Sequence, residues 1–322
     1  MEASAPDPRP RSLALGMSLP KGAVAPGRAD PIARPGVSST DLMLLGMSVI
    51  WGVNFSVVKY GTTQMPALAF NGVRMTVAVA TLAVLVLLRG GLRMSWRDAG
   101  ALFSLGLLGN GLYQILFIEG ISRTRAGTVA LILAAGPAFV ALIGRLFGVE
   151  RVSARGWGGI ALSLAGIALV TASAPAASSG SATVLGNVLV LAGALCWATF
   201  SVLLKPYANR IGAVQLGAVT MTGGLLPLLL VASPALGSVR WAALPAGVWG
   251  AVVYSGFGAL VVAGLFWLRG VRVLGPTRTA MYVNLQPVMA LLVAWAWLHE
   301  VPTGAQVAGT GAIIAGVLLT RS

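Results

Sequence analysis

A single arginine, Arg74, interrupts the apolar stretch formed by residues 66–88, about a third of the way along it. A guanidinium near the middle of a bilayer costs about 2.5–3.5 kcal/mol on insertion scales, so we expect a specific reason for its presence. Its planar fork could hold a carboxylate through two parallel hydrogen bonds. Alternatively, it could bond the carbonyls of a helix end or extend its charged head to the membrane surface. Asn71, one helical turn earlier, faces the same way and shares both interpretations.

Amide and aromatic side chains recur at helical spacing in other apolar stretches. Trp51 and Asn54 share one face of one stretch, and Asn110 and Gln114 share one face of another. Such faces could line a cavity with hydrogen-bonding and aromatic surface. They could also join neighbouring helices, as polar residues commonly do in membranes. Trp197, which pairs with Trp51 in the repeat described below, could reach the same cavity.

A third face is formed by Arg278, Tyr282 and Gln286, which are four residues apart and lie just before Pro287. Asn284 points to a different face, so we expect it to lie away from this one. These three faces, together with Arg74, Asn71 and Trp197, give the predicted substrate-binding residues. They are Trp51, Asn54, Asn71, Arg74, Asn110, Gln114, Trp197, Tyr282 and Gln286.

Three further tryptophans, Trp267, Trp295 and Trp297, lie near the ends of apolar stretches. Tryptophan commonly anchors a helix at the membrane–water interface. We therefore expect these three side chains at the interface and not in a cavity.

Few residues could support catalysis or metal binding. The chain has one histidine, His299, and one cysteine, Cys196, and no apolar stretch has an acidic residue at its centre. These observations argue against an intramembrane enzyme, a metal site and any cofactor, and they give little support to proton coupling through a buried acid. Glu119 and Arg123 are spaced as a surface ion pair.

The composition is that of a membrane protein. Hydrophobic residues make up 57% of the chain and charged residues only 9%, whereas a soluble domain has roughly 25% charged residues. The net charge of +14 is spread between apolar blocks, which argues against nucleic-acid binding. Lipid is therefore the expected surrounding. Residues 1–40 differ, with seven prolines, five basic residues and no long apolar run; we expect a disordered cytoplasmic tail.

The remaining chain contains ten apolar blocks, each long enough to be read as a membrane-spanning helix. Short breaks rich in Gly, Pro, Ser and charged residues separate them. The predicted spans are 41–60, 66–88, 99–119, 126–147, 154–173, 184–204, 213–232, 245–268, 275–298 and 303–320.

Basic residues predict the orientation, because lysine and arginine are retained on the cytoplasmic side. With the N-terminus inside, fifteen basic residues counted from Lys21 to Arg321 fall on the inner side. The outer side has four, which are Lys59, Arg123, Arg125 and Arg240. Both termini are therefore predicted to be cytoplasmic.

The two halves of the chain are similar in sequence. A shift of 150 aligns five pairs of identical residues. They are Ala130 with Ala280, Pro137 with Pro287, Glu150 with Glu300, Gly159 with Gly309, and Gly166 with Gly316. A shift of 146 aligns Trp51 with Trp197 and Lys59 with Lys205. The first five spans (41–173) are thus repeated as the second five (184–320).

An odd number of spans per repeat places the second copy in the membrane upside down. Inverted repeats of this kind are typical of secondary transporters, with the substrate site near the midplane. Pro137 and Pro287 each remove a backbone hydrogen bond at matching points. They are candidate gating kinks, or simply packing kinks. The small residues of the fifth and tenth spans are expected to pack inside the molecule, with a homodimer contact as the alternative.

Residues 120–170, GISRTRAGTVALILAAGPAFVALIGRLFGVERVSARGWGGIALSLAGIALV, resemble the EamA-type repeat of the drug/metabolite transporter superfamily, and residues 270–319 repeat the pattern. WGVNFSVVK (51–59) and FNGVRMTVAVA (70–80) resemble the first two spans of that family. Leu298 and His299 before Glu300 depart from the usual Gly-Glu. The resemblance covers nearly the whole chain from about residue 41.

The resemblance implies an all-α integral membrane protein with ten helices, built as two inverted five-helix repeats around a central cavity. It also implies a secondary transporter of the inner membrane that moves a small organic metabolite, such as an amino acid, a derivative or a drug, mostly outward. A channel or lipid-translocating protein and a sensor with the transporter fold are the alternatives.

Overall fold

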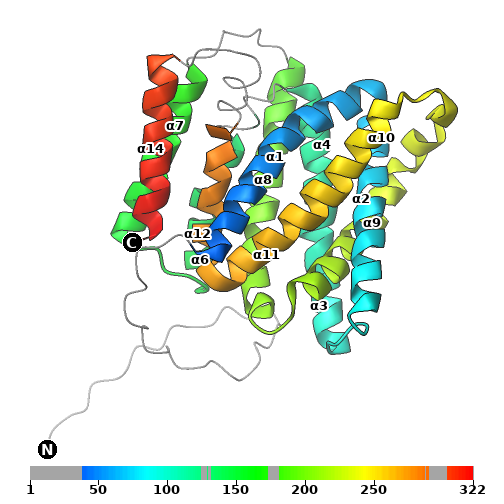
Figure 1. The fold of residues 1–322 in the computed structure, drawn as a ribbon, viewed down its shortest axis with the longest axis horizontal. Helices are drawn as coiled ribbons and strands as arrows, with labels where there is room; N and C mark the ends of the chain where they lie inside the picture. The colour runs from blue at the N-terminus through cyan, green and yellow to red at the C-terminus, as the bar shows by residue number, and fades with distance from the viewer. Residues whose placement is uncertain are drawn as a thin grey trace, which may run out of the picture. The chain divides into compact units, whose positions relative to one another are not determined.

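A computed structural model of the protein describes residues 38–124, 129, 132–172, 181–286, 288–289 and 303–321. Within these ranges the regular secondary structure is helical (Figure 1). The first half contains α1 (Ser39–Gln64), α2 (Ala67–Leu88), α3 (Trp96–Gly106), the π-helix η1 (Leu107–Leu112), α4 (Tyr113–Arg123), α6 (Gly136–Leu146) and α7 (Ala154–Ala172).

The second half follows the same order of elements. It contains α8 (Ser181–Ala208), α9 (Ala213–Gly237), the 3-10 turn η2 (Trp241–Ala243), α10 (Ala246–Val253), the π-helix η3 (Tyr254–Val262), α11 (Ala263–Leu274), α12 (Pro276–Met281), the 3-10 helix η4 (Tyr282–Leu285) and α14 (Gly304–Arg321). Apart from the short 3-10 turn η2, these elements form ten helical segments in the described residues, five from each half, because α3–η1–α4, α10–η3–α11 and α12–η4 are each continuous. Six of the ten are long and apolar enough to cross a membrane.

The first span begins with a capping box. The amide of Asp41 donates to Ser38 Oγ at 3.2 Å, and the amide of Ser38 donates to Asp41 Oδ2 at 2.8 Å. This exchange satisfies two amides at the start of the helix, and the carboxylate also lies at the positive end of the helix dipole. α1 therefore starts at Ser39, inside the segment that the sequence predicted as tail; residues 1–37 lie outside the described part.

Each span contacts a span of the other half. α2 packs on α9, α4 on α8, α11 on α1, α6 on α12, and α7 on α14. Figure 1 shows the last pair side by side, green against red. Exchanging the two halves maps this set of pairs onto itself, as a twofold relation requires. The inverted repeat predicted from sequence is therefore the arrangement that the helices adopt.

The contact between α7 and α14 is itself symmetric under the exchange of the two halves. A Cβ added to Gly166 would lie 2.6 Å from the carbonyl oxygen of Gly309, and one added to Gly159 would lie 2.6 Å from that of Gly316. These two contacts exchange under the shift of 150 that relates the halves. Between them, Ser163 Oγ donates to the carbonyl of Ile313 at 3.3 Å, and these two residues are also 150 apart. The small residues of these spans are thus used inside the chain, as expected.

The paired lysines also occupy equivalent places. Lys59 Nζ of α1 donates to the carbonyl of Ile121 at the end of α4, at 3.3 Å. Lys205 Nζ of α8 donates to the carbonyl of Val271 near the end of α11, at 2.7 Å, and to that of Arg272 at 2.9 Å. Ile121 and Val271 are 150 positions apart. Each lysine therefore places its charge on the carbonyls at a helix C-terminus, where a cation is favoured.

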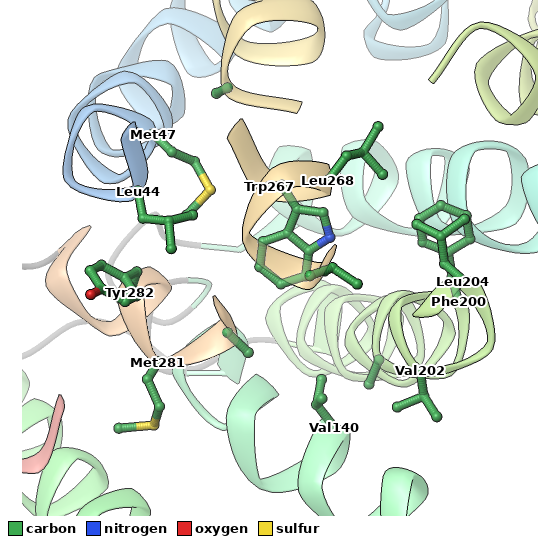
Figure 2. Packing of buried hydrophobic residues seen from close by; sticks show 14 of the residues in the cluster. Leu44, Met47, Val140, Phe200, Val202, Leu204, Trp267, Leu268, Met281 and Tyr282 are labelled. Atoms are coloured by element: carbon green, nitrogen blue, oxygen red, sulfur yellow. The ribbon is translucent and has the colours of Figure 1, made fainter. Parts of the chain in front are cut away.

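A cluster of buried hydrophobic side chains joins α1, α6, α8 and α11. Figure 2 shows Trp267 at its centre, with Leu44 and Met47 of α1 on one side and Phe200 of α8 on the other. Trp267 is only 2% exposed. The prediction that Trp267 anchors the protein at the interface is therefore wrong. Its helix continues to Leu274, six residues beyond the predicted span end at 268. Trp267 therefore lies in the interior of the helix and not at its end. Trp295 and Trp297 lie outside the described residues.

Candidate functional site

A cavity of about 110 Å³ lies between the two halves of the fold. One water needs roughly 10–15 Å³ on this measure, so the space holds several waters or part of a small organic molecule. Both halves contribute to its wall. The lining residues include Trp51, Asn54, Arg74, Asn110, Tyr113, Gln114, Pro137, Trp197, Ala259, Trp267 and Gln286.

Arg74 is the only charged residue among the described residues that line the cavity. It projects from α2 and is 1% exposed. Its Nε donates to Asn71 Oδ1 at 2.7 Å, and its Nη2 donates to Gln114 Oε1 at 2.8 Å. Its Nη1 donates to Ser255 Oγ at 2.8 Å. Three partners from three different segments thus fix the orientation of the guanidinium.

The partners of Arg74 are themselves held in place. Ser255 Oγ donates onward to Asn54 Oδ1 at 2.7 Å, and Asn71 Nδ2 donates to the carbonyl of Gln114 at 3.1 Å. The network therefore joins α1, α2 and α4 of the first half to η3 of the second half. The sequence analysis grouped Asn71 with Arg74 but did not identify Ser255, because a serine in an apolar helix usually bonds its own backbone.

Among the described residues, Arg74 has no anionic partner. All its hydrogen-bond acceptors are neutral oxygens, and the ring of Phe70 lies 5.9 Å from Cζ. Arginine has five N–H donors, so one N–H on each terminal nitrogen finds no acceptor among the described residues. Burial of an uncompensated charge costs several kcal/mol. The site is thus electrostatically prepared for an anion.

Aromatic side chains form another part of the wall. Trp51, Trp197 and Trp267 pack mutually, with ring centroids 5.4–6.2 Å apart. Tyr113 extends the group, with its ring 5.0 Å from that of Trp197. These distances are within the range of favourable aromatic pairs. The sequence analysis predicted two of the three tryptophans in this place and missed Trp267.

Two π-helical segments shape the cavity at matching positions of the two halves. η1 carries Asn110, and η3 carries Ala259. Trp51 Nε1 donates to the carbonyl of Ala259 at 2.9 Å, which fixes the indole against the cavity wall. π-Helical segments occur frequently at functional sites. Nothing in the sequence distinguishes them from ordinary helix, so they were not predicted.

Asn110 and Gln286 line the cavity, and their side-chain amides form no hydrogen bond with another described residue. They are 4% and 5% exposed. An amide in such a place loses free energy unless a ligand or water satisfies it. These two side chains are therefore available donors and acceptors for a bound molecule.

The third predicted face is not formed as expected. Gln286 lines the cavity, whereas Tyr282 lies outside its wall and donates a hydrogen bond from its hydroxyl to Asp41 Oδ1. Arg278 is exposed. Tyr282–Leu285 is a 3-10 helix with three residues per turn, so the four-residue spacing no longer keeps these side chains on one face. Pro287 lies outside the described residues.

Other predicted residues are placed as follows. Pro137 is in the first turn of α6 and lines the cavity beside Gly136. The helix is interrupted at Ala135, just before α6 begins. This break places Pro137 in a first helical turn, where proline is better accommodated than in a helix interior. The predicted pair of Glu119 and Arg123 is an ion pair in the structure, with both side chains partly exposed.

Asn284 is fully buried, and neither atom of its side-chain amide has a partner among the described residues. It is not among the residues that line the cavity. This agrees with the expectation that it faces away from Gln286.

Comparison with known proteins gives a consistent result. The model of the EamA-like transporter family matches residues 38–172 and again residues 184–322. A solved crystal structure superposes with a TM-score of 0.72 at 20% sequence identity, covering 88% of this chain and 99% of that one. At this identity the superposition supports the fold alone.

Several named proteins are similar over most of their length. The probable terminal-alkyne amino-acid exporter of Streptantibioticus cattleyicolor is 30% identical, over 84% of this chain and 89% of that protein. The uncharacterized inner membrane transporter YedA of Escherichia coli K12 is 28% identical, over 86% and 88%. The uncharacterized transporter YyaM of Bacillus subtilis is 25% identical, over 86% and 92%.

Proposed function

Because the chain belongs to the EamA-like transporter family, we propose that it is a secondary transporter that carries a small organic metabolite through the cavity around Arg74 by alternating access. The family establishes a multi-pass membrane transporter and not an enzyme. The substrate, the direction and the mechanism are part of the proposal.

One observation carries the assignment of the substrate site. The cavity lies between the two inverted halves and contains the charge of Arg74, with no acidic residue among its described lining residues. It also contains the amides of Asn110 and Gln286, which form no hydrogen bond with another described residue. Substrates of transporters with inverted repeats bind at the interface between the repeats. We propose Trp51, Asn54, Arg74, Asn110, Gln114, Trp197, Trp267 and Gln286 as the residues that surround the substrate, with Asn71 positioning Arg74.

Export across the cytoplasmic membrane, with both termini in the cytoplasm, is the proposed direction and orientation. The excess of basic residues on one side supports the orientation, and the exporter from Streptantibioticus cattleyicolor supports the direction. The helical span is interrupted at Ala135, and Pro137 lies in the first turn that follows, beside the cavity. We propose that this break, together with the matching Pro287, allows the spans to bend as access alternates.

Flux measurements in proteoliposomes test the proposal. The purified chain is reconstituted, and uptake is followed for a panel of amino acids, organic acids, neutral metabolites and dyes. Saturable uptake that a competitor inhibits, and that is accelerated by unlabelled substrate on the opposite side, identifies a carrier. A linear, uninhibited flux would identify a channel instead, and saturable binding without any flux would identify a sensor.

Matched variants locate the substrate site. Gln286→Ala and Asn110→Ala each remove an amide from the cavity wall, and we expect both to weaken transport. Ser104→Ala changes an exposed residue of α3 whose hydroxyl bonds only its own helix, and it serves as the control. Unchanged transport in both cavity variants would exclude this cavity as the substrate site.

A further inference from the structure

We infer that the ligand of this cavity is an organic monoanion, a single carboxylate on an apolar or aromatic body that carries no ammonium group. The inference rests on the proposed function, because it names the substrate class of the same cavity. It distinguishes this chain from a carrier of zwitterionic amino acids.

The charge balance of the cavity is the first argument. Arg74 contributes one positive charge, and its three hydrogen-bond partners are neutral. No aspartate or glutamate is found among the described residues that line the cavity. A ligand with one negative charge makes the filled site neutral, whereas a cation or a neutral molecule leaves the buried charge uncompensated. A dianion would leave one negative charge without a partner.

The donors left on Arg74 give the second argument. One N–H on each terminal nitrogen has no acceptor among the described residues, because Nη1 and Nη2 each donate once, to Ser255 and Gln114. A carboxylate has two oxygens and can accept both hydrogens, and pairs of this type are the strong ones. The hydrogen bonds to Asn71, Ser255 and Gln114 hold the guanidinium in place before the ligand arrives.

Apart from the amides of Asn110 and Gln286, the rest of the wall fits an apolar body. The indoles of Trp51, Trp197 and Trp267 pack together as one aromatic surface. Further apolar lining comes from Phe117 and Met221. The polar groups of the network lie around Arg74, so a molecule with one anionic end and one hydrophobic end matches the distribution of polarity in the cavity.

An α-ammonium group would not be matched. In an amino acid it is attached to the carbon next to the carboxylate, so a carboxylate bound to Arg74 would bring the ammonium close to the guanidinium. Two like charges repel more strongly at a buried site than in bulk water. The tryptophans could attract a cation through their ring faces, but such a contact is weak compared with loss of the ammonium's hydration. We therefore expect the zwitterion to bind more weakly than the matching acid.

Four compounds with the same phenyl body test the inference: 3-phenylpropionate, 3-phenylpropanamide, phenylalanine and phenethylamine. Binding to the purified wild-type chain is measured by calorimetry, and counterflow of each compound is measured in proteoliposomes. We expect the carboxylate to bind at least about 10-fold more tightly than the other three, because each lacks the charge-assisted pair or adds an uncompensated charge.

A variant tests the same inference without changing Arg74, whose removal could prevent folding. Gln286→Glu adds an acid to the cavity wall at nearly constant shape, and Gln286 has no side-chain hydrogen bond to another described residue that the change would break. We expect its affinity for 3-phenylpropionate to fall about 10-fold and its preference over phenylalanine to disappear. Gln64→Glu makes the same chemical change at an exposed position near the end of α1 and controls for the added charge.

The outcomes separate the inference from the proposed function. Equal or tighter binding of the amide, the amine or phenylalanine by the wild type overturns the inference and leaves a transporter of another substrate class. No binding of the carboxylate to folded protein also overturns it, as does an unchanged preference in Gln286→Glu. Selective binding of the carboxylate without counterflow supports the ligand class and instead contradicts the proposed transport.

Discussion

Arg74 of the first half and Ser255 of the second half are 181 residues apart and joined by a hydrogen bond of 2.8 Å. The hydroxyl of Ser255 donates in turn to Asn54, so the guanidinium is bound to both halves of the fold at once. A change in how the halves pack would therefore alter the surroundings of the one cavity charge found in the described residues. The predictions that follow address this network and the contacts that hold the halves together.

Arg74→Lys should abolish most transport while keeping the positive charge. A lysine donates from a single nitrogen, so it cannot reach the oxygens of Asn71, Ser255 and Gln114 in the planar arrangement of a guanidinium. Buried acceptors left unpaired cost about 1–3 kcal/mol each. We expect a lower unfolding temperature in detergent and at least about 10-fold slower flux. Arg89→Lys, at an exposed position, is the control. Wild-type flux in Arg74→Lys would show that the fork geometry has no role.

Ser255→Ala should destabilise the protein by about 1–3 kcal/mol, because it removes an acceptor of Arg74 and a donor to Asn54 from a buried place. The free energy of unfolding, measured by denaturant titration in mixed micelles, reports the loss. Ser104→Ala is the matched control, since it deletes the same hydroxyl from an exposed position. An equal effect of both variants would mean that the network contributes no stability.

Gly166→Ala should weaken the contact between α7 and α14. The added methyl group would lie 2.6 Å from the carbonyl oxygen of Gly309, so the helices must separate. Overpacking of this kind typically costs about 1–3 kcal/mol. Gly311→Ala makes the same change on α14, with no atom within 4 Å of the new carbon. Thermal unfolding of the two variants, followed by circular dichroism, should differ by several degrees; indistinguishable curves would contradict the packing described here.

Lys205→Met should destabilise the fold more than Lys59→Met. Lys205 caps two carbonyls at 2.7 and 2.9 Å, whereas Lys59 caps one at 3.3 Å. Hydrogen bonds to charged groups contribute about 1.5–3 kcal/mol when well formed and less when long. The two lysines occupy equivalent places in the repeat, so each variant serves as the reference for the other. The reverse order of unfolding temperatures would argue against helix capping as the role of Lys205.

Much of the architecture could be predicted from the sequence, because the length of apolar blocks and their repetition depend on the order of residues along the chain. The apolar blocks, the repeat that pairs Lys59 with Lys205, and the grouping of Arg74 with Asn71 all follow from spacing along regular helices. The errors occur where regularity fails. Tyr282 lies off the cavity wall because a 3-10 turn changes its direction, and Trp267 is buried because its helix continues beyond the predicted end.

The π-helices η1 and η3 and the partner Ser255 could not be predicted for a related reason. A π-helix differs from an α-helix by a small change in hydrogen bonding that many apolar sequences can accommodate. The network around Arg74 depends on contacts between segments far apart in the chain. One sequence gives the polar residues of each helix but not which of them meet.

The charge of Arg74 also breaks the symmetry that relates the two halves. Arg74, Met75 and Thr76 correspond to Thr220, Met221 and Thr222 at the shift of 146, so the second copy has a threonine where the first has the arginine. Thr220 bonds the carbonyl of Leu216 in its own helix and does not reach the network. If the second copy also carried the charge, the twofold relation could make the states open to either side equivalent in the charge that they present. With one arginine they are chemically different, so the resting population of the two states and the affinity on each side are free to differ.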